Sequence, residues 1–354
     1  MNWHPLRLTT PFQTYGFGGS AIIDRLGKTG LPLPTIAETW EVSDVEGHIA
    51  TVREGELRGQ SLRQLALEHP QEMMGRGWTG PHFPLLAKFL DGAGMLPVHL
   101  HGNDEAARRV YNEPNGKSEA WHILDAAPGA TVLVGLLDGV DMETLREALL
   151  RQDYDAVMRR IPVRAGDTVY VPGGALHSFG PDTLIYEIQQ TSDIGLDAMP
   201  YDMDGKRYDV ETWHQRIDGL IDQLEPALRP VVQAGLRVPA GTDNDRTYCC
   251  AGPYFALERW RVGATEPLRH SFETALILSN PAAPCKVRVG DWAGTLGRAE
   301  TLLLPAVLGE VMVEGPADVL AAYLPDLEKD VIAPLRAAGY GPEVINTLGE
   351  VNAS

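Results

Sequence analysis

The sequence predicts a mainly β protein made of two sandwich- or barrel-like units, with inserted and connecting helices. Three observations support this fold class. Glycine (37 residues) and proline (26 residues) are frequent and spread along the chain, where they separate many short apolar stretches. Longer stretches with helical periodicity lie between them, and the pattern of short strands and turns returns after about residue 245. The 354 residues suffice for two medium-sized domains with sizeable cores.

Each element is expected from its own local pattern. Apolar and β-branched runs bounded by turn residues predict strands in the first block at 37–43, 48–57, 95–102, 119–126, 131–137, 167–174 and 183–190. Helical periodicity predicts helices at 61–75, 142–160 and 210–236, the last kinked or split at its prolines. Strands return within 254–263, 272–280, 286–297 and 311–324, and the tail at 324–351 reads as helical.

Four regions follow from this order. We expect a first β domain at 1–205, with N-terminal strands and an inserted helix, and a helical connector at 206–240. A second β domain would occupy 241–325, and a helical tail 326–354. Two β blocks joined by a helical segment are typical of paired sandwiches or barrels.

The net charge, the apolar runs and the cysteines limit the kinds of binding partner and the compartment that we expect. The net charge of −18 argues against nucleic acid or an anionic membrane, since both would be repelled, and leaves a small molecule as the expected partner. The N-terminus has no apolar signal-peptide core, and no apolar run is long enough to span a bilayer. Three cysteines without CxxC spacing, Cys249, Cys250 and Cys285, indicate free thiols in a reducing compartment, so we expect the cytoplasm. The sequence does not decide whether the chain forms a homo-oligomer.

Two histidines stand one residue apart in "MLPVHLHGND" (95–104). Side chains alternate along a strand, so Pro97, His99 and His101 point one way, and Val98 and Leu100 the other. A single histidine in an apolar strand is usually a hydrogen-bonded core residue. Two imidazoles side by side favour a shared cation.

Two later segments strengthen the metal interpretation. "NGKSEAWHIL" (115–124) places Glu119 at a strand start, and "RAGDTVYVPGGALHSFG" (164–180) bends at Pro-Gly-Gly before His177. This order resembles the metal site of cupins, which are jelly-roll proteins. Three neutral imidazoles and one carboxylate suit a divalent transition metal with positions left for substrate oxygens. The alternative reads Glu119 as a solvated strand-end charge and His177 as a loop histidine.

A closer resemblance rests on several motifs in the same order. "AETWEVSD", with its short Glu-x-Trp strand, "HFPLLAKFLDGAGMLPVHLHGNDEAARR", "GKSEAWHIL", "VRAGDTVYVPGGALHSFG" and "YEIQQTSD" are similar to motifs of the type I mannose-6-phosphate isomerases, or phosphomannose isomerases. The similarity covers roughly residues 5–205, with a looser fit of the C-terminal block to that family's second cupin domain. It implies a fold of two cupin (jelly-roll) domains, with the metal in the first and none in the second. The metal would be zinc in first place, with Mn, Fe, Co or Ni as alternatives.

The resemblance also implies roles for individual residues. The ligands would be His99, which stands where most members have glutamine, with His101, Glu119 and His177. Lys117 matches the family's active-site lysine, and Glu187 and Asp193 match acidic residues after the histidine strand, which makes these three the catalytic candidates. Lys88 matches another family lysine and is a candidate for substrate binding. Trp40, with Tyr15 or Phe17, is a candidate to line a sugar pocket, with core packing as the alternative.

Two positions depart from the family pattern. The serine that helps to bind phosphate aligns with Pro97, which offers neither a hydroxyl nor a backbone N–H. The arginine that contacts the charged end of the substrate aligns with Asp197, which repels a phosphate instead of pairing with it. Lys206 and Arg207 follow as loop residues and are more simply solvated. Either the pocket takes an unphosphorylated sugar or polyol, or phosphate binds through other residues.

The resemblance therefore implies a metal-dependent aldose–ketose isomerase, on mannose 6-phosphate or on a free sugar. Such an enzyme moves a proton between C1 and C2 through an enediol and needs a base and a cation. A non-catalytic cupin that binds or senses a sugar is the first alternative, because the arginine and the serine are missing. Another cupin chemistry, dioxygenation or epimerisation, is a third, because the extra histidine makes the ligand set resemble that of general cupins.

Overall fold

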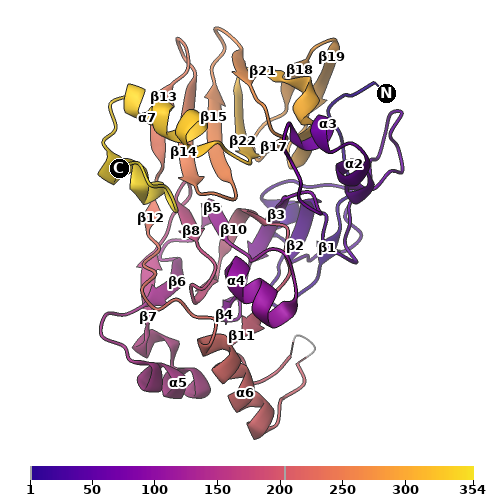
Figure 1. Ribbon diagram of the computed structural model, residues 1–354. Helices are drawn as coiled ribbons and strands as arrows, with labels where there is room; N and C mark the ends of the chain where they lie inside the picture. Colours follow the sequence, from indigo (N-terminus) through magenta and orange to yellow (C-terminus); the bar gives the residue numbers. More distant parts are fainter. Residues whose placement is uncertain (1, 203–204) are drawn as a thin grey trace.

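The computed structural model describes residues 2–202 and 205–354 and contains two double-sheet β units stacked on one another (Figure 1). The first unit pairs a seven-stranded sheet with a five-stranded sheet. The seven-stranded sheet runs in the order β1 (Phe12–Gln13), β2 (Glu38–Val42), β3 (Leu85–Gly92), β10 (Thr183–Gln190), β5 (Glu119–Ala126), β8 (Thr168–Val171) and β12 (Val232–Gln233). The five-stranded sheet runs β11 (Leu196–Asp197), β4 (His99–Leu100), β9 (His177–Phe179), β6 (Thr131–Leu136) and β7 (Met158–Pro162).

The second unit repeats the plan with a six-stranded and a four-stranded sheet. The six-stranded sheet runs β13 (Leu236–Pro239), β14 (Asp245–Ala251), β15 (Ala256–Val262), β22 (Ala317–Tyr323), β17 (Leu276–Asn280) and β20 (Glu300–Leu304). The four-stranded sheet runs β16 (Leu268–Ser271), β21 (Glu310–Glu314), β18 (Cys285–Val289) and β19 (Trp292–Leu296). All pairings between these strands are antiparallel, as expected for sandwiches in which each sheet buries one face.

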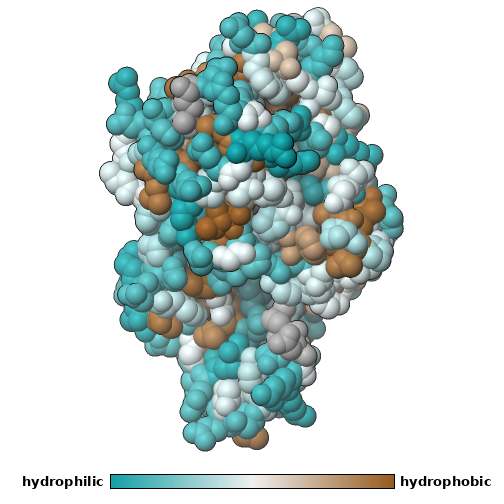
Figure 2. Space-filling view, turned by 90° about the vertical axis from the view of Figure 1, so that its right-hand side faces the viewer, coloured by the Kyte–Doolittle hydropathy of each residue, from teal (hydrophilic) through white to brown (hydrophobic). Residues whose placement is uncertain are grey.

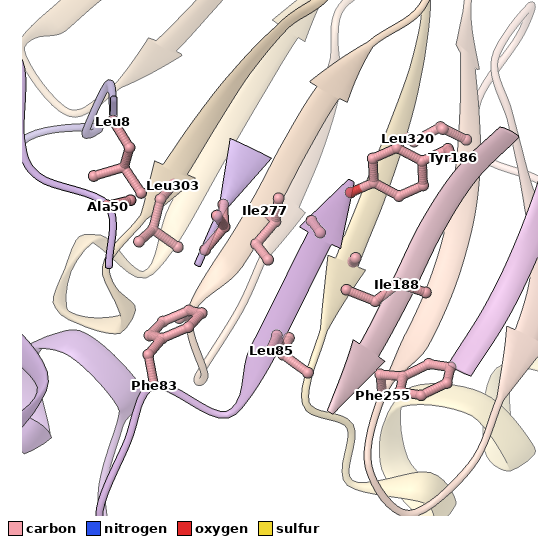
Figure 3. Packing of buried hydrophobic residues seen from close by; sticks show 14 of the residues in the cluster. Leu8, Ala50, Phe83, Leu85, Tyr186, Ile188, Phe255, Ile277, Leu303 and Leu320 are labelled. Carbon is pink, nitrogen blue, oxygen red and sulfur yellow. The ribbon is translucent and has the colours of Figure 1, made fainter. Parts of the chain in front are cut away.

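The two large sheets face each other across the middle of the molecule. Figure 3 shows this contact, where Leu85 and Ile188 of the first unit meet Ile277, Leu303 and Leu320 of the second. A separate apolar cluster fills the inside of the first unit, and another the inside of the second. The seven-stranded sheet is therefore buried on both faces, which explains why β3 and β10 are buried at every position.

Helices cover the ends and one outer face. α5 (Met142–Arg151) and α6 (Val210–Ile221) pack on the outer face of the five-stranded sheet (Figure 1). The tail forms short helical turns, η4 (Leu327–Ile332), α7 (Ala333–Ala337), α8 (Pro342–Ile345) and η5 (Asn346–Leu348), which add apolar side chains to the core of the second unit. The remaining short helices are α1 (Ala21–Asp24), α2 (Leu62–Glu68), α3 (Pro70–Met74), α4 (Asp104–Ala106), η1 (Ala107–Tyr111), η2 (Tyr154–Ala156) and η3 (Ala306–Leu308).

Three predicted helices are shorter than the sequence indicates. The helix expected at 142–160 ends at Arg151, because Gln152 turns left-handed (φ 60°) and the following residues form η2 and then β7, which pairs with β6. The helix expected at 61–75 is broken where Pro70 starts a second helix. The helix expected at 210–236 ends at Ile221, before either proline, and β12 and β13 follow.

The predicted strand at 48–57 is reduced to isolated bridges at Thr51 and Val52. The predicted connector at 206–240 is divided between the units, because β12 pairs with β8 of the first and β13 with β14 of the second. No helix in the described part of the chain is long and apolar enough to cross a bilayer. On the face shown in Figure 2, hydrophobic side chains form separate small patches between hydrophilic areas.

Candidate metal centre and active site

Three histidines and one glutamate converge inside the first unit. His99 starts β4, His101 follows that strand directly, Glu119 starts β5 and His177 starts β9. One ligand atom from each lies within 4.8 Å of the ligand atoms of the other three. β4 and β9 are neighbours with His99 opposite His177, so hydrogen bonding between these strands sets the distance between the two rings. The convergence predicted from the sequence is present.

Backbone carbonyls orient two of the imidazoles. His99 Nδ1 lies 2.9 Å from the carbonyl oxygen of Pro97, and His177 Nδ1 lies 2.7 Å from that of Ala175. In each ring Nδ1 therefore donates its proton, which leaves the lone pair on Nε2. The two Nε2 atoms are 2.9 Å apart. Two lone pairs at that distance repel, so this arrangement calls for a proton or a cation shared between the rings.

Burial sets the charge states of the four groups. It lowers the pKa of His101 to about 4 and also lowers the pKa values of His99 and His177, which keeps the imidazoles neutral. Burial opposes ionisation of Glu119, but its neighbours His101 and Lys117 hold the pKa of that carboxyl well below its usual range. The site thus offers three neutral nitrogen donors and one carboxylate.

Three buried polar atoms of this group have no hydrogen-bond partner among the described residues. His101 Nε2 and Glu119 Oε2 are buried and 3.0 Å apart, yet neither forms a hydrogen bond of acceptable geometry with any described residue. His101 Nδ1 is also without one. Buried polar groups are normally satisfied, and a nitrogen-rich set of four such donors fits a divalent transition cation.

A lysine between two carboxylates lies beside the metal group. Lys88 on β3 is buried, and its Nζ lies 3.1 Å from Glu187 Oε1 and 3.5 Å from Glu38 Oε2. Burial opposes the charged form of Lys88, but Glu187 and Glu38 outweigh it, so the pKa of Lys88 is raised. Burial, followed by the charge of Glu119, raises the pKa of Glu187 to about 7. Such a carboxyl can hold or release a proton near neutral pH.

The other predicted site residues lie around this centre. Lys117 Nζ is 3.6 Å from Glu119 Oε2. Asp197 on β11 is opposite His99 on β4. Asp193 lines a cavity of about 420 Å³, to which residues 191–194 all contribute. The negative charge of Asp193 contributes to the raised pKa of Lys88.

Trp40 is part of the core beside the site. Its side chain is 1% exposed, the ring of His48 lies against it at 4.8 Å, and Lys88 Nζ lies 4.8 Å from the ring centre. The indole N–H donates to Glu38 Oε2 at 2.7 Å. In this structure Trp40 holds Glu38 and Lys88 in place, and its contact with a sugar stays a prediction.

Known proteins match both the sequence and this architecture. The family model for the phosphomannose isomerase type I catalytic domain matches residues 6–124. Mannose-6-phosphate isomerase ManA from Bacillus subtilis is 29% identical over 326 residues, which cover 92% of this chain and 100% of the relative. A crystal structure of mannose 6-phosphate isomerase from Bacillus subtilis superposes with a TM-score of 0.80 at 25% identity, over 90% of this chain and 99% of that one.

The chain is therefore similar to type I phosphomannose isomerases, by the family model over residues 6–124 and by individual relatives over about nine tenths of its length. These similarities identify it as an isomerase and confirm the predicted cupin fold. A further mannose 6-phosphate isomerase structure, described as bound with zinc and yttrium, shares the fold at 15% identity, with a TM-score of 0.70 over 90% of this chain and 99% of that one. Three of the four donors, His99, His101 and Glu119, lie within the residues that the family model matches.

Glu38 is a site residue that sequence reasoning missed. The signal was present, because Glu-x-Trp occurs in three strand segments, at 38–40, 119–121 and 258–260, and once more at 211–213 on helix α6. In each of the three strands the indole N–H donates to the glutamate two residues earlier, at 2.7, 2.8 and 2.7 Å. The pattern thus marks buried glutamates that are fixed by their own strand, and two of the three, Glu38 and Glu119, line the metal centre and its lysine.

The third Glu-x-Trp pair belongs to a polar cluster inside the second unit. Glu258 accepts two hydrogen bonds from Arg246, at 2.6 and 2.7 Å, and one from the hydroxyl of Tyr323 at 2.6 Å. His270 stacks on Trp260 at 4.8 Å, and burial lowers its pKa to about 4. His270, the third of the four residues of β16, thus lies partly buried beside this cluster.

Proposed function

We propose that this chain is a metal-dependent aldose–ketose isomerase whose cation is held by His99, His101, Glu119 and His177. The single observation that carries the proposal is the convergence of these four donors beside a buried lysine–carboxylate pair. Zinc is the first choice of metal because three imidazoles and a carboxylate are ordinary zinc ligands, and a relative is described with zinc. Three free cysteines, all buried, support a reducing compartment and hence the cytoplasm.

The residues around the donors supply the remaining chemistry. A bound divalent cation would stabilise negative charge on the sugar oxygens next to C1 and C2. Glu187, with a pKa near 7, is suited to carry the proton between the two carbons, and Lys88 fixes its position at 3.1 Å. Lys117 adds positive charge beside Glu119, and Asp193 lies at the open side, where it can exchange protons with solvent. Trp40 and Tyr15 would exclude water from the inner wall.

The electrostatics at the open side favour an uncharged sugar end. Asp197 lies next to His99, where the family pattern has an arginine, and Pro97 supplies only a carbonyl, which is already engaged by His99. The cavity beside Asp193 is also acidic, being lined by four carboxylates, one arginine and one histidine: Asp44, Glu46, Glu113, Asp193, Arg63 and His82. Arg63 is already bonded to Asp44 and Glu46. We therefore propose an unphosphorylated aldose as substrate, since a phosphate dianion would lose roughly 2–5 kcal/mol there.

Mannose 6-phosphate is the second candidate substrate. It is favoured by the names of the relatives, which match almost the whole chain. Lys206 and Arg207 are exposed residues near the end of β11 and are the cations that such a substrate would have to recruit.

The test is isomerisation of matched substrates by the metal-loaded protein. Mannose, other free aldoses and mannose 6-phosphate are incubated in D₂O, and ketose formation and deuterium incorporation at C2 are followed by NMR. Turnover of a free aldose with a kcat/KM at least tenfold above that for mannose 6-phosphate supports the proposal. The reverse ratio selects the second candidate. Tight sugar binding without exchange at C2 of any sugar would show a non-catalytic sugar-binding cupin.

Asp197→Arg tests the charge argument within the same site. It restores a guanidinium where the family has one, so the ratio of kcat/KM for mannose 6-phosphate to that for mannose should rise by at least tenfold. Asp197→Asn is the matched control, since it removes the repulsion without adding a partner and should give a smaller rise. An unchanged ratio in both variants would show that this position does not face the distal end of the sugar.

A further inference from the structure

A second cavity lies at the junction of the two units, away from the metal centre. It has a volume of about 440 Å³, within the range of small-molecule sites. Its walls come from residues 7–10, Phe12, residues 28–32, Glu41 and Arg53 of the first unit, and from residues 298–301 of the second. None of the four metal-centre residues lines it.

The walls of this junction cavity are held together by both units. Leu6 and Leu303 exchange two backbone hydrogen bonds, at 2.7 and 3.0 Å. Lys28 Nζ donates to Glu41 Oε2 at 2.8 Å and to the carbonyl oxygen of Ala299 at 2.9 Å. The cavity is therefore preformed.

Positive charge is in excess inside the cavity. Four cationic side chains line it, against two carboxylates, in a chain whose net charge is −18. Glu41 neutralises Lys28, and Glu300 pairs with Arg7 at 2.6 Å. Among the described residues no carboxylate lies within ion-pair distance of Arg53 or Arg298, so two guanidinium charges in the cavity stay without an ion-pair partner.

Arg298 is also fixed in orientation. Its Nε donates to the carbonyl oxygen of Leu26 at 2.7 Å, and one Nη donates to that of Arg25 at 2.6 Å. These bonds use two of its five N–H groups and do not cancel its charge. Thr10 and Thr29 add hydroxyl groups to the same lining. Fixed guanidinium groups and hydroxyls are the groups with which proteins bind phosphate.

We propose that the junction cavity is a second binding site, for a small phosphate-bearing anion. Arg53 and Arg298 would be its charged contacts, and the threonine hydroxyls would bind remaining oxygens. The site is independent of the proposed isomerase activity, since it shares no residue with the metal centre. The cavity and the metal centre share one strand, β2. Its residues 38 and 40 border the metal centre, and its residue 41 borders the cavity.

The test is a titration of the metal-loaded protein with inorganic phosphate at low salt, in which isothermal titration calorimetry measures the Kd. Arg53→Gln should raise the Kd at least tenfold, and it should fold normally because its side chain forms no hydrogen bond or ion pair with another described residue. Arg164→Gln changes another exposed arginine, which lies outside the cavity; it is the control and should leave the Kd unchanged. Arg298→Gln should weaken binding as Arg53→Gln does.

A variant of the metal centre separates the two sites. His101→Ala should keep wild-type phosphate affinity if the anion binds in the junction cavity. Loss of binding in His101→Ala together with an unchanged Kd in Arg53→Gln would overturn the proposal, since the anion would then bind at the metal centre. Absence of measurable phosphate binding to the wild-type protein would overturn it as well, whatever the isomerase assays show.

Discussion

His99 and His177 face each other with both Nε2 lone pairs pointing inward, because each Nδ1 is bound to a backbone carbonyl. This arrangement gives Pro97 a structural role in the metal site. Its carbonyl orients His99, although its ring offers no hydroxyl or N–H to a phosphate. Pro97 thus positions the imidazole of His99 through its carbonyl oxygen.

Removal of one imidazole should abolish metal binding. In His177→Ala the remaining donors leave one coordination position open and a buried carboxylate uncompensated, so the metal content should fall from one ion per chain to well below one. Elemental analysis by mass spectrometry after dialysis measures this. His270→Ala, an interior histidine of the second unit, is the control and should retain the ion. Equal metal content in both variants would contradict the assignment of the site.

Glu187 should give the activity its pH dependence. Its pKa is raised to about 7, so the carboxylate that accepts a proton forms as the pH rises through neutrality. We expect kcat/KM to increase from pH 6 to pH 8 and then level off. Glu187→Gln should lower kcat by about 10²–10⁴, whereas Glu187→Asp keeps a carboxylate and should retain more activity. A flat profile and an active glutamine variant would assign the proton transfer to another group.

At the scale of elements, single strands serve two different environments. On β10, Tyr186 and Ile188 pack between the units, whereas Ile185 and Glu187 point into the first unit. Such alternation follows from any strand at 183–190, but alternation by itself does not tell a pocket face from an outer surface. On β2 the register shifts after Trp40, so Val42 joins the inter-unit core instead of following Trp40 into the site.

The C-terminal tail should be a stabilising element. Leu335 and Leu348 are fully buried in the core of the second unit, and Tyr170 of the first unit donates to Glu350 Oε2 at 2.7 Å. Leu348→Ala should lower the free energy of unfolding by about 2–5 kcal/mol. Val344→Ala in the same tail, where the side chain is 44% exposed, should change it by about 0.5 kcal/mol or less. Urea denaturation compares the two, and equal effects would show that the tail is not docked.

At the scale of the whole molecule, four sheets and a helical layer are stacked, and the contact between the units is largely apolar. His122 is a polar exception on the inter-unit side of β5. It is buried, its Nδ1 bonds to Thr168 Oγ1 at 2.9 Å, and Nε2 has no hydrogen-bond partner among the described residues. Burial, with Arg259 nearby, lowers its pKa from 6.5 to about 3.

This histidine should make the stack sensitive to acid. Between pH 6.5 and 3 the unfolded chain binds a proton at His122 that the folded chain does not, so stability is lost as the pH falls through 6.5. From pH 7 to pH 5 this one group should cost about 2 kcal/mol. His122→Gln should reduce that loss, as measured by denaturation of metal-loaded protein at both pH values. His214→Gln on α6, away from the inter-unit contact, is the control and should match the wild type.

Local patterns predicted much of the fold. The strands at 119–126 and 183–190 have the predicted bounds, because each is a run of apolar and β-branched residues between turn signals. The same reasoning failed at 142–160, where residues with good helical periodicity are taken into β7 by pairing with β6, and at 48–57, where no continuous partner strand is available. Pairing partners are distant in the sequence and leave no local signal.

By itself, the sequence determined which side chains could bind a metal and in which order they come, because His-x-His alternation and the later glutamate and histidine are local features. Only the tertiary structure decided that Glu38 and Lys88 join them, that Glu187 is the carboxyl with a pKa near 7, and that Arg53 and Arg298 share a cavity. The physical reason is that pKa values and charge excess depend on burial and on neighbours from other strands. Those neighbours are set by sheet register and by the stacking of two units, which no single segment encodes.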